Sequence, residues 1–220
     1  MNAAAGEIVH RWLGRRPYAD VFAAQQAFTR GRDPSTTDEL WSLEHDSVFT
    51  QGQAGRAEHL LLPGDIPVVA SDRGGQVTWH GPGQLVVYLL LDVRRRGLGV
   101  RALVSIIEDA IIEYLASLGI ESAARPDAPG VYVAGAKIAA LGLRISRGRS
   151  YHGLSLNVDA DLEPFSRIDP CGMAGLPVTR LADLGVAASV TQVRDGLLPI
   201  LAARLGGEVV DGEAVLPTPS

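Results

Sequence analysis

The chain has one cysteine, Cys171, in the turn-like stretch Ile168-Asp169-Pro170-Cys171-Gly172. The proline fixes the backbone on one side, and the glycine leaves the approach to the sulfur uncrowded on the other. A lone cysteine is more often a small buried hydrophobe, although a loop position between proline and glycine weakens that interpretation. A thiol with a lowered pKa would be a nucleophile. Packing and covalent catalysis are both open interpretations of Cys171.

Lys137 is the second candidate, because it interrupts an apolar strand pattern. Side chains alternate between the two faces of a strand, so Lys137 shares its face with residues 133, 135, 139, 141 and 143, none of which is polar. The pattern predicts a partly desolvated lysine, and the alternative is a β-bulge at Gly135 that turns Lys137 out to solvent. An ammonium beside the Cys171 sulfur would stabilise the thiolate, and a fall of roughly two units in the thiol pKa would make it the main form at neutral pH.

The densest cluster of glycine and polar residues runs from Asp72 to Gln84 and leads into an apolar strand. Paired glycines let the backbone approach a ligand closely and can offer amide donors to an oxyanion. Neither G-x-G-x-x-G nor G-x-x-x-x-G-K-[ST] occurs, so no nucleotide-phosphate loop is indicated. The alternative interpretation is a tight turn without a ligand.

His80 and His152 each precede a glycine near a predicted strand. With Cys171 they could form a zinc site or a Cys–His pair, but C-x-x-C and H-x-x-x-H spacings are absent. We therefore expect hydrogen-bonded histidines that line a pocket, and no metal.

The predicted elements alternate too irregularly for a doubly wound parallel sheet, so the fold class is α+β with a mixed or antiparallel sheet. The residue at 189 with Gln192 forms a capping-box pattern for the last helix, which Pro199 should bend or interrupt. Gly119 is suited to end the helix before it. Expected strands cover residues 8–13, 40–45 and 66–70, expected helices cover 18–30 and 100–118, and the main sheet is expected within 75–92, 130–145 and 151–158.

Length and composition predict one domain over residues 1–220, with a loosely held tail from about residue 211. The N-terminus lacks the features of a signal peptide, and no apolar run is long enough to cross a membrane, so we expect a cytoplasmic chain in a reducing compartment. A net charge of −5 argues against nucleic acid as a partner. Two arginine clusters, at residues 94–96 and at 144, 147 and 149, are either solvated loops or docking sites for an acidic partner.

Four segments resemble, in order and spacing, the lipoyl (octanoyl) transferase family. They are RGGQVTWHGPGQ at residues 73–84, GAKIAALGL at 135–143, HGLSLNV at 152–158 and PCGM at 170–173. The resemblance spans about residues 40–185, and the combination of four motifs is specific where each alone would be weak.

The resemblance implies the fold of biotin and lipoate protein ligase catalytic domains, a single α+β domain with mixed sheets flanked by helices. It also implies a ping-pong reaction without a cofactor. Cys171 would take octanoate from octanoyl-acyl carrier protein, and Lys137 would lower the thiol pKa. The acceptors would be lysines in the lipoyl domains of 2-oxoacid dehydrogenase complexes and in the glycine cleavage H protein, and these protein partners tend to be acidic.

The resemblance further implies a set of substrate-binding residues. Trp79 stands where the family has tyrosine, so an aromatic wall is kept and a phenolic hydroxyl is lost. The implied set is Arg73, Gly74, Gly75, Gln76, Val77, Thr78, Trp79, His80, Ala140, Leu141, Gly142, Gly153, Leu154 and Ser155.

Two other functions remain possible from the sequence. One is an ATP-dependent lipoate–protein ligase, which forms an acyl-adenylate and needs no cysteine nucleophile. The other is a non-catalytic lipoyl-domain binding protein in which Cys171 only packs. A thioester donor is already activated, so the absence of a phosphate-loop motif favours the transferase.

Overall fold

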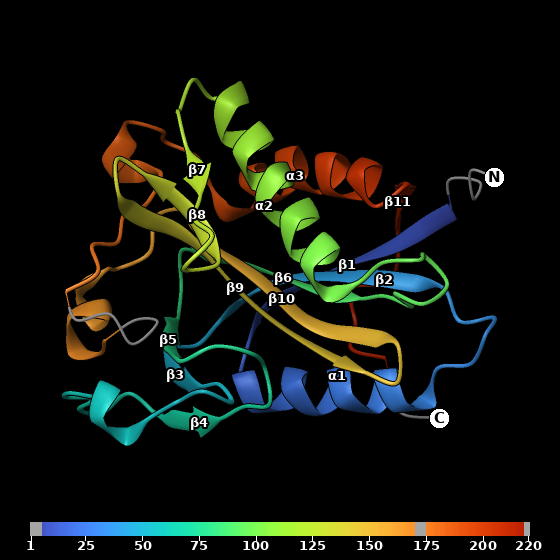
Figure 1. The fold of residues 1–220 in the computed structure, drawn as a ribbon, viewed down its shortest axis with the longest axis horizontal. Coiled ribbons are helices and arrows are strands. Elements are labelled where there is room, and N and C mark those ends of the chain that lie inside the picture. The colour runs from blue at the N-terminus through green and yellow to red at the C-terminus, as the bar shows by residue number, and fades with distance from the viewer. Residues whose placement is uncertain (1–5, 170–174, 218–220) are drawn as a thin grey trace.

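The structure is a computed structural model that describes residues 6–169 and 175–217. Eight strands form one mixed sheet in the order β11-β1-β2-β6-β10-β9-β8-β7, and three form a small sheet in the order β4-β3-β5. In the large sheet β1 pairs in parallel with β11 and β2, and the other neighbours are antiparallel. The predicted α+β class with mixed sheets is confirmed (Figure 1).

The strands of the large sheet are β1 (Gly6–Arg16), β2 (Asp38–His45), β6 (Gln84–Leu90), β7 (Ala123–Ala124), β8 (Gly130–Val133), β9 (Ala136–Ser146), β10 (Arg149–Asn157) and β11 (Gly207–Asp211). The small sheet holds β3 (Val48–Gln51), β4 (Val68–Ala70) and β5 (Val77–His80). The α-helices are α1 (Tyr18–Gly31), α2 (Val100–Ser117) and α3 (Val190–Arg204), with 3-10 turns η1 (Ala57–His59), η2 (Glu163–Arg167) and η4 (Ala182–Leu184).

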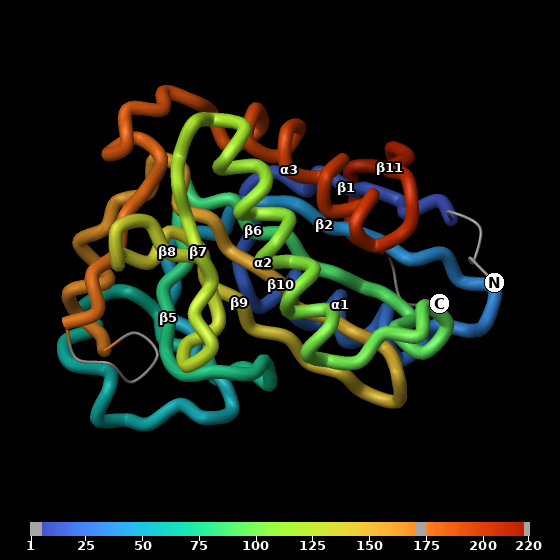
Figure 2. The backbone as a smooth tube through the Cα atoms, turned by 45° about the horizontal axis from the view of Figure 1, so that its top comes forward, coloured from blue at the N-terminus to red at the C-terminus, as the bar shows by residue number. Residues whose placement is uncertain are grey.

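Helices cover both faces of the large sheet: α2 and α3 lie on one face, and α1 lies on the other (Figure 1, Figure 2). Strand β6 is therefore apolar on both sides and buried along its whole length. Leu85, Val87 and Leu89 join the main core under α2 and α3, whereas Val86 and Tyr88 join the smaller cluster under α1. This strand separates the two cores and passes directly beside the pocket described below.

The helix ends follow from the sequence. Gly119 adopts a left-handed φ of 77°, and the Ile120 amide donates to the Leu115 carbonyl, which ends α2 as predicted. The Ser189 capping box at the start of α3 is also present. Pro199 does not interrupt α3, so of the two expected effects, a bend or a break, the break is excluded; leucines on both sides of it are buried in the main core and hold the two turns together.

Other boundaries differ from the predictions. The segment 75–92, expected to lie in the main sheet, holds two strands, β5 in the small sheet and β6 in the large one, with a turn at residues 81–83. The C-terminal strand β11 was not predicted; it pairs with β1, and the Gly212 amide then donates to the His10 carbonyl. None of the described helices has the length and apolar character needed to cross a membrane.

Candidate active site

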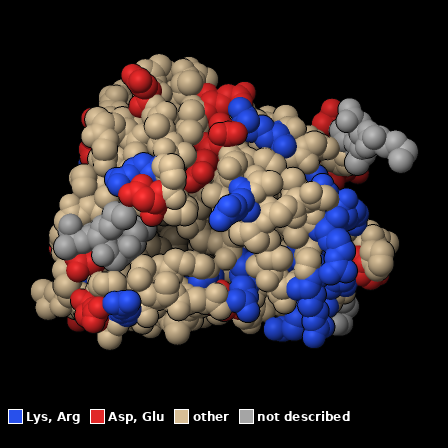
Figure 3. Space-filling view, viewed as in Figure 1, with Lys and Arg blue, Asp and Glu red and all other residues tan. Residues whose placement is uncertain are grey.

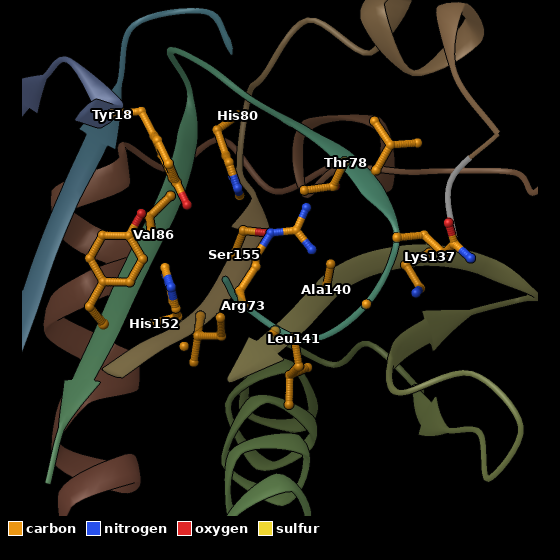
Figure 4. Close-up of a pocket in the computed structure, with 17 residues that line it drawn as sticks. Tyr18, Arg73, Thr78, His80, Val86, Lys137, Ala140, Leu141, His152 and Ser155 are labelled. Carbon is orange, nitrogen blue, oxygen red and sulfur yellow. The ribbon is translucent and has the colours of Figure 1, made fainter. Parts of the chain in front are cut away.

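A pocket lies where β5, β6, β9, β10 and the start of α1 meet (Figure 4). Its long direction runs from Lys137 at one end to Tyr18, His80, Val86 and His152 at the other. Most of the predicted substrate-binding residues line it, namely Arg73, Gly75, Gln76, Val77, Thr78, His80, Ala140, Leu141, Gly142, Gly153, Leu154 and Ser155. Three segments far apart in the sequence thus converge on one cavity.

Gly74 and Trp79, also in the predicted set, do not line this pocket. The Gly74 amide donates to the Leu143 carbonyl at 3.0 Å and fixes the glycine loop to the edge of β9. Trp79 is 2% exposed, and its Nε1–H donates to the Ser47 hydroxyl at 2.8 Å. Alternation along β5 places Thr78 and His80 toward the pocket and Trp79 in the small core beside Phe165.

Lys137 is 4% exposed, so the predicted burial is confirmed. Its Nζ donates to the Pro129 carbonyl at 3.2 Å and lies 5.2 Å from the centre of the Tyr132 ring. Gly135 belongs to the two-residue turn between β8 and β9, with φ of 85°, and does not form a bulge. The bulge lies at Ile138, where β9 has one residue more than β8.

Glu108 of α2 fixes the position of residues 129 and 130, against which the Lys137 side chain packs. Oε1 of Glu108 accepts from the Gly130 amide at 2.8 Å, and the residue as a whole is 8% exposed. Burial raises the Glu108 pKa, while the positive charge of Lys137 acts to lower it. A Cβ on Gly130 would lie 3.0 Å from Cε of Lys137 and 2.6 Å from the Ala139 carbonyl, so glycine is required where the lysine packs. Glu108, Gly130 and Pro129 thus form a support for Lys137.

The far end of the pocket holds neutral histidines. The His80 pKa is lowered to about 3 by burial and neighbouring charges, and its Nδ1–H donates to Gln84 Oε1 at 2.7 Å. His152 donates from Nε2 to Asp72 at 2.8 Å, yet burial lowers its pKa to about 4. Just behind, His45 accepts from the Tyr88 hydroxyl at 2.7 Å. These side chains form an uncharged, aromatic end wall.

Arg73 brings a positive charge to the middle of the pocket. It is 7% exposed, and its guanidinium donates to the Thr50 carbonyl at 2.6 Å and to the Gly74 carbonyl at 2.9 Å. These bonds join the glycine loop to β3 of the small sheet. The charge also contributes to the lowered pKa of His80 and of His152.

Tyr18, Val86 and Tyr88 line the pocket but were not predicted as site residues. Tyr18 begins α1, and its ring stacks on His80 with an interplanar angle of 6°. Val86 and Tyr88 alternate with the main-core residues of β6, so the period-2 pattern of that strand could have indicated a second buried face. No sequence signal pointed to Tyr18, since its contact with His80 spans distant segments.

Cys171 lies outside the described residues. The chain that follows it runs along the lysine: the Lys137 amide donates to the Pro177 carbonyl at 2.8 Å, and the Thr179 amide donates to the Lys137 carbonyl at 3.0 Å. Pro177 is six residues after Cys171, a span of at most about 20 Å. No group of three or more metal-ligating side chains occurs among residues 6–169 and 175–217.

Residues 17–202 match the lipoyl protein ligase A/B catalytic domain family. In fold, the chain is similar to lipoate-protein ligase A bound with ATP, with a TM-score of 0.78 and 16% identity over 95% of this chain and 89% of that one. A biotin protein ligase from Aquifex aeolicus is a more distant match in fold, with a TM-score of 0.54 and 15% identity over 90% of this chain and 68% of that one. The fold and its pocket thus define a catalytic domain of the lipoyl ligase type.

Two curated relatives narrow this class. An octanoyltransferase of Pseudomonas putida is 65% identical, over 85% of this chain and 87% of that protein. One of Marinobacter nauticus is 58% identical, over 93% of this chain and 97% of that protein. The chain belongs to the lipoyl protein ligase A/B catalytic domain family and, within it, to the octanoyltransferases.

Proposed function

We propose that the chain transfers an octanoyl group from octanoyl-acyl carrier protein to a lysine of a lipoyl domain, through a thioester on Cys171. The observation that carries the proposal is Lys137, a buried lysine at one end of a pocket with an uncharged opposite end. The identity of the acyl group and the class of reaction are proposed from the names of the relatives, which are octanoyltransferases. The acceptors proposed are lipoyl domains of 2-oxoacid dehydrogenase complexes and the glycine cleavage H protein.

In the first step the Cys171 thiolate attacks the carbonyl carbon of the donor thioester. The new carbon–sulfur bond forms, the bond to the carrier thiol breaks, and the carrier leaves as a thiolate that takes up a proton. A charged Lys137 near the sulfur would favour the thiolate over the thiol. Thiol exchange is nearly isoenergetic, so the step needs no ATP.

In the second step the acceptor lysine, as a neutral amine, attacks the acyl-cysteine. The amide bond forms, the carbon–sulfur bond breaks, and the amine proton passes to solvent or to a neutral Lys137. The cytoplasm that the sequence suggests would keep Cys171 reduced between turnovers.

The pocket would select the acyl group by length. Burial of the octanoyl methylenes would contribute roughly 4 to 5 kcal/mol. Ala140, Leu141 and Gly142 of β9 and Leu154 of β10 line the cavity between its ends. The end wall of Tyr88 and His152 would stop a longer chain, because both side chains are buried and fixed by hydrogen bonds.

Intact-mass spectrometry tests the proposal. Incubation with octanoyl-acyl carrier protein and no ATP should add one octanoyl group to the wild-type chain, labile to hydroxylamine, and none to Cys171→Ser. The adduct should then pass to a lipoyl domain. A wild-type chain that stays unmodified, or that forms octanoyl amide only with ATP, contradicts the transferase and supports the ligase.

A further inference from the structure

The two arginine clusters of the sequence meet at one end of the molecule. Arg94 packs over the β9–β10 turn, where a Cβ on Gly148 would lie 3.1 Å from its Nε. Arg149 donates to the Thr29 carbonyl at 3.1 Å, beside the exposed Arg30 at the end of α1. Figure 3 shows Lys and Arg gathered over this end of the visible face. We call Arg30, Arg94, Arg147 and Arg149 the hairpin-tip surface.

The neighbouring arginines have a different role. Arg32, Arg95 and Arg96 all form ion pairs with Asp38, whose side chain is 1% exposed. Their role is therefore to compensate the charge of this buried carboxylate. Within residues 6–169 and 175–217, by contrast, no carboxylate forms a salt bridge with a member of the hairpin-tip surface. Four cationic groups are therefore available to a partner on a chain with a net charge of −5.

An open groove next to the pocket is lined by residues of β9, of the start of α2 and of the glycine loop. Its lining includes Leu143 of β9, four residues before Arg147, and Pro129, the hydrogen-bond acceptor of Lys137. The groove shares Gly75, Gln76, Leu141 and Gly142 with the pocket and is otherwise lined by Gly74, Val100, Val104, Asp127 and Ala128.

We propose that the hairpin-tip surface docks the carrier protein that donates the octanoyl group, and that the groove holds the carrier's phosphopantetheine arm. This inference rests on the proposed function. The arm is a long flexible chain attached through a phosphodiester, which is an anion, and the carrier is expected to be acidic. An unpaired basic surface on a negatively charged chain would steer such a partner and fix its orientation. The groove would then guide the thioester to Lys137.

Charge reversal tests the docking surface. The double variant R147E/R149E should raise the KM for octanoyl-acyl carrier protein about tenfold or more, with the effect reduced at high salt. Acylation by octanoyl-pantetheine, which has the arm but no protein, should not change. The control is Arg15→Glu, a single arginine-to-glutamate change at a side chain that is 60% exposed and lies outside the hairpin-tip surface. It should leave the rates of acylation by both donors unchanged.

Binding separates this inference from the proposed function. The Kd of the holo-carrier protein, measured without acyl transfer, should rise about tenfold or more in R147E/R149E even if the chain were never acylated. Equal affinity for the carrier in variant and wild type overturns the docking surface. A loss of rate confined to the transfer from Cys171 to the acceptor lysine also overturns it, because the surface would then bind the lipoyl domain instead of the carrier.

A blocking substitution tests the groove. Val100 is 55% exposed, so Val100→Trp should leave the fold intact while narrowing the groove. Acylation by octanoyl-pantetheine and by octanoyl-acyl carrier protein should both slow about tenfold. Wild-type rates with both donors would show that the arm follows another path, and a melting curve confirms that the variant is folded.

Discussion

At the residue scale, Lys137 shows which features of the site can be read from a sequence. Its burial was expected from the apolar residues around it in the sequence, although the bulge at Ile138 breaks the strict alternation on which that prediction relied. Glu108 was not predicted, although it lies four residues after Val104 and three before Ile111, on the apolar side of α2. A carboxylate in that position required a buried donor, and only the fold reveals that this donor is the Gly130 amide.

Glu108 should act as a positioning residue for Lys137. Glu108→Ala leaves the Gly130 amide without its acceptor and frees Pro129, so kcat should fall about 10- to 100-fold. The KM for octanoyl-acyl carrier protein should change less than kcat, because Glu108 itself lines neither the pocket nor the groove. Steady-state kinetics on the folded variant measures both constants.

Glu108→Gln is the matched control for this prediction. It keeps a carbonyl oxygen for the Gly130 amide and removes only the charge, so most of the activity should return. A glutamine variant as slow as the alanine variant would contradict the role of the hydrogen bond and assign the effect to the charge.

At the element scale, the sequence predicted most helices and strands where a local pattern determines them. Helix α2 and the cap of α3 were correct because an apolar stripe, a glycine and a capping box are local features. The addition of β11 to β1 and the split between β5 and β6 depend on contacts between distant segments. No local pattern specifies those contacts.

Gly153 illustrates a residue whose predicted role and structural role overlap. It lines the pocket as expected, but a Cβ there would lie 2.0 Å from the Val87 carbonyl of β6. We therefore expect Gly153→Ala to destabilise the protein by roughly 1 to 3 kcal/mol, because β10 must move away from β6. Chemical denaturation measures the loss.

Gly31→Ala at the end of α1 is a suitable control, since no atom lies within 4 Å of the added Cβ. It should be neutral or slightly stabilising. Equal stability of Gly153→Ala and wild type would mean that the two strands separate easily at this point, and that the glycine serves the substrate alone.

At the scale of the whole molecule, the pocket lies where the two cores of the sheet approach each other. The four motifs indicated that residues 73–80, 140–142 and 153–155 come together, and most of them do. The end wall was missed because Tyr18 and Tyr88 reach it from α1 and β6, elements outside those motifs. The residues that line the pocket were thus more predictable than its end wall.

The buried histidines should make the stability of the whole fold depend on pH. Burial lowers the pKa to about 4 for His45, about 3 for His80 and about 4 for His152. In the unfolded chain each pKa returns to about 6.5, so the unfolded state binds more protons between pH 6.5 and 4. Stability is therefore complete above pH 6.5 and falls as the pH drops through this window.

Each histidine should contribute roughly 1 to 2 kcal/mol of this loss between pH 6.5 and 5. For three histidines, and at about 2 to 4 °C per kcal/mol, the thermal unfolding midpoint should accordingly be roughly 6 to 24 °C lower at pH 5 than at pH 7. His152→Gln, which cannot take up a proton, should make the decline shallower, because its side chain has the same charge in the folded and unfolded chains. A midpoint that is constant between pH 7 and 5 would mean that the histidines become protonated in the folded protein, and that water reaches the end wall of the pocket.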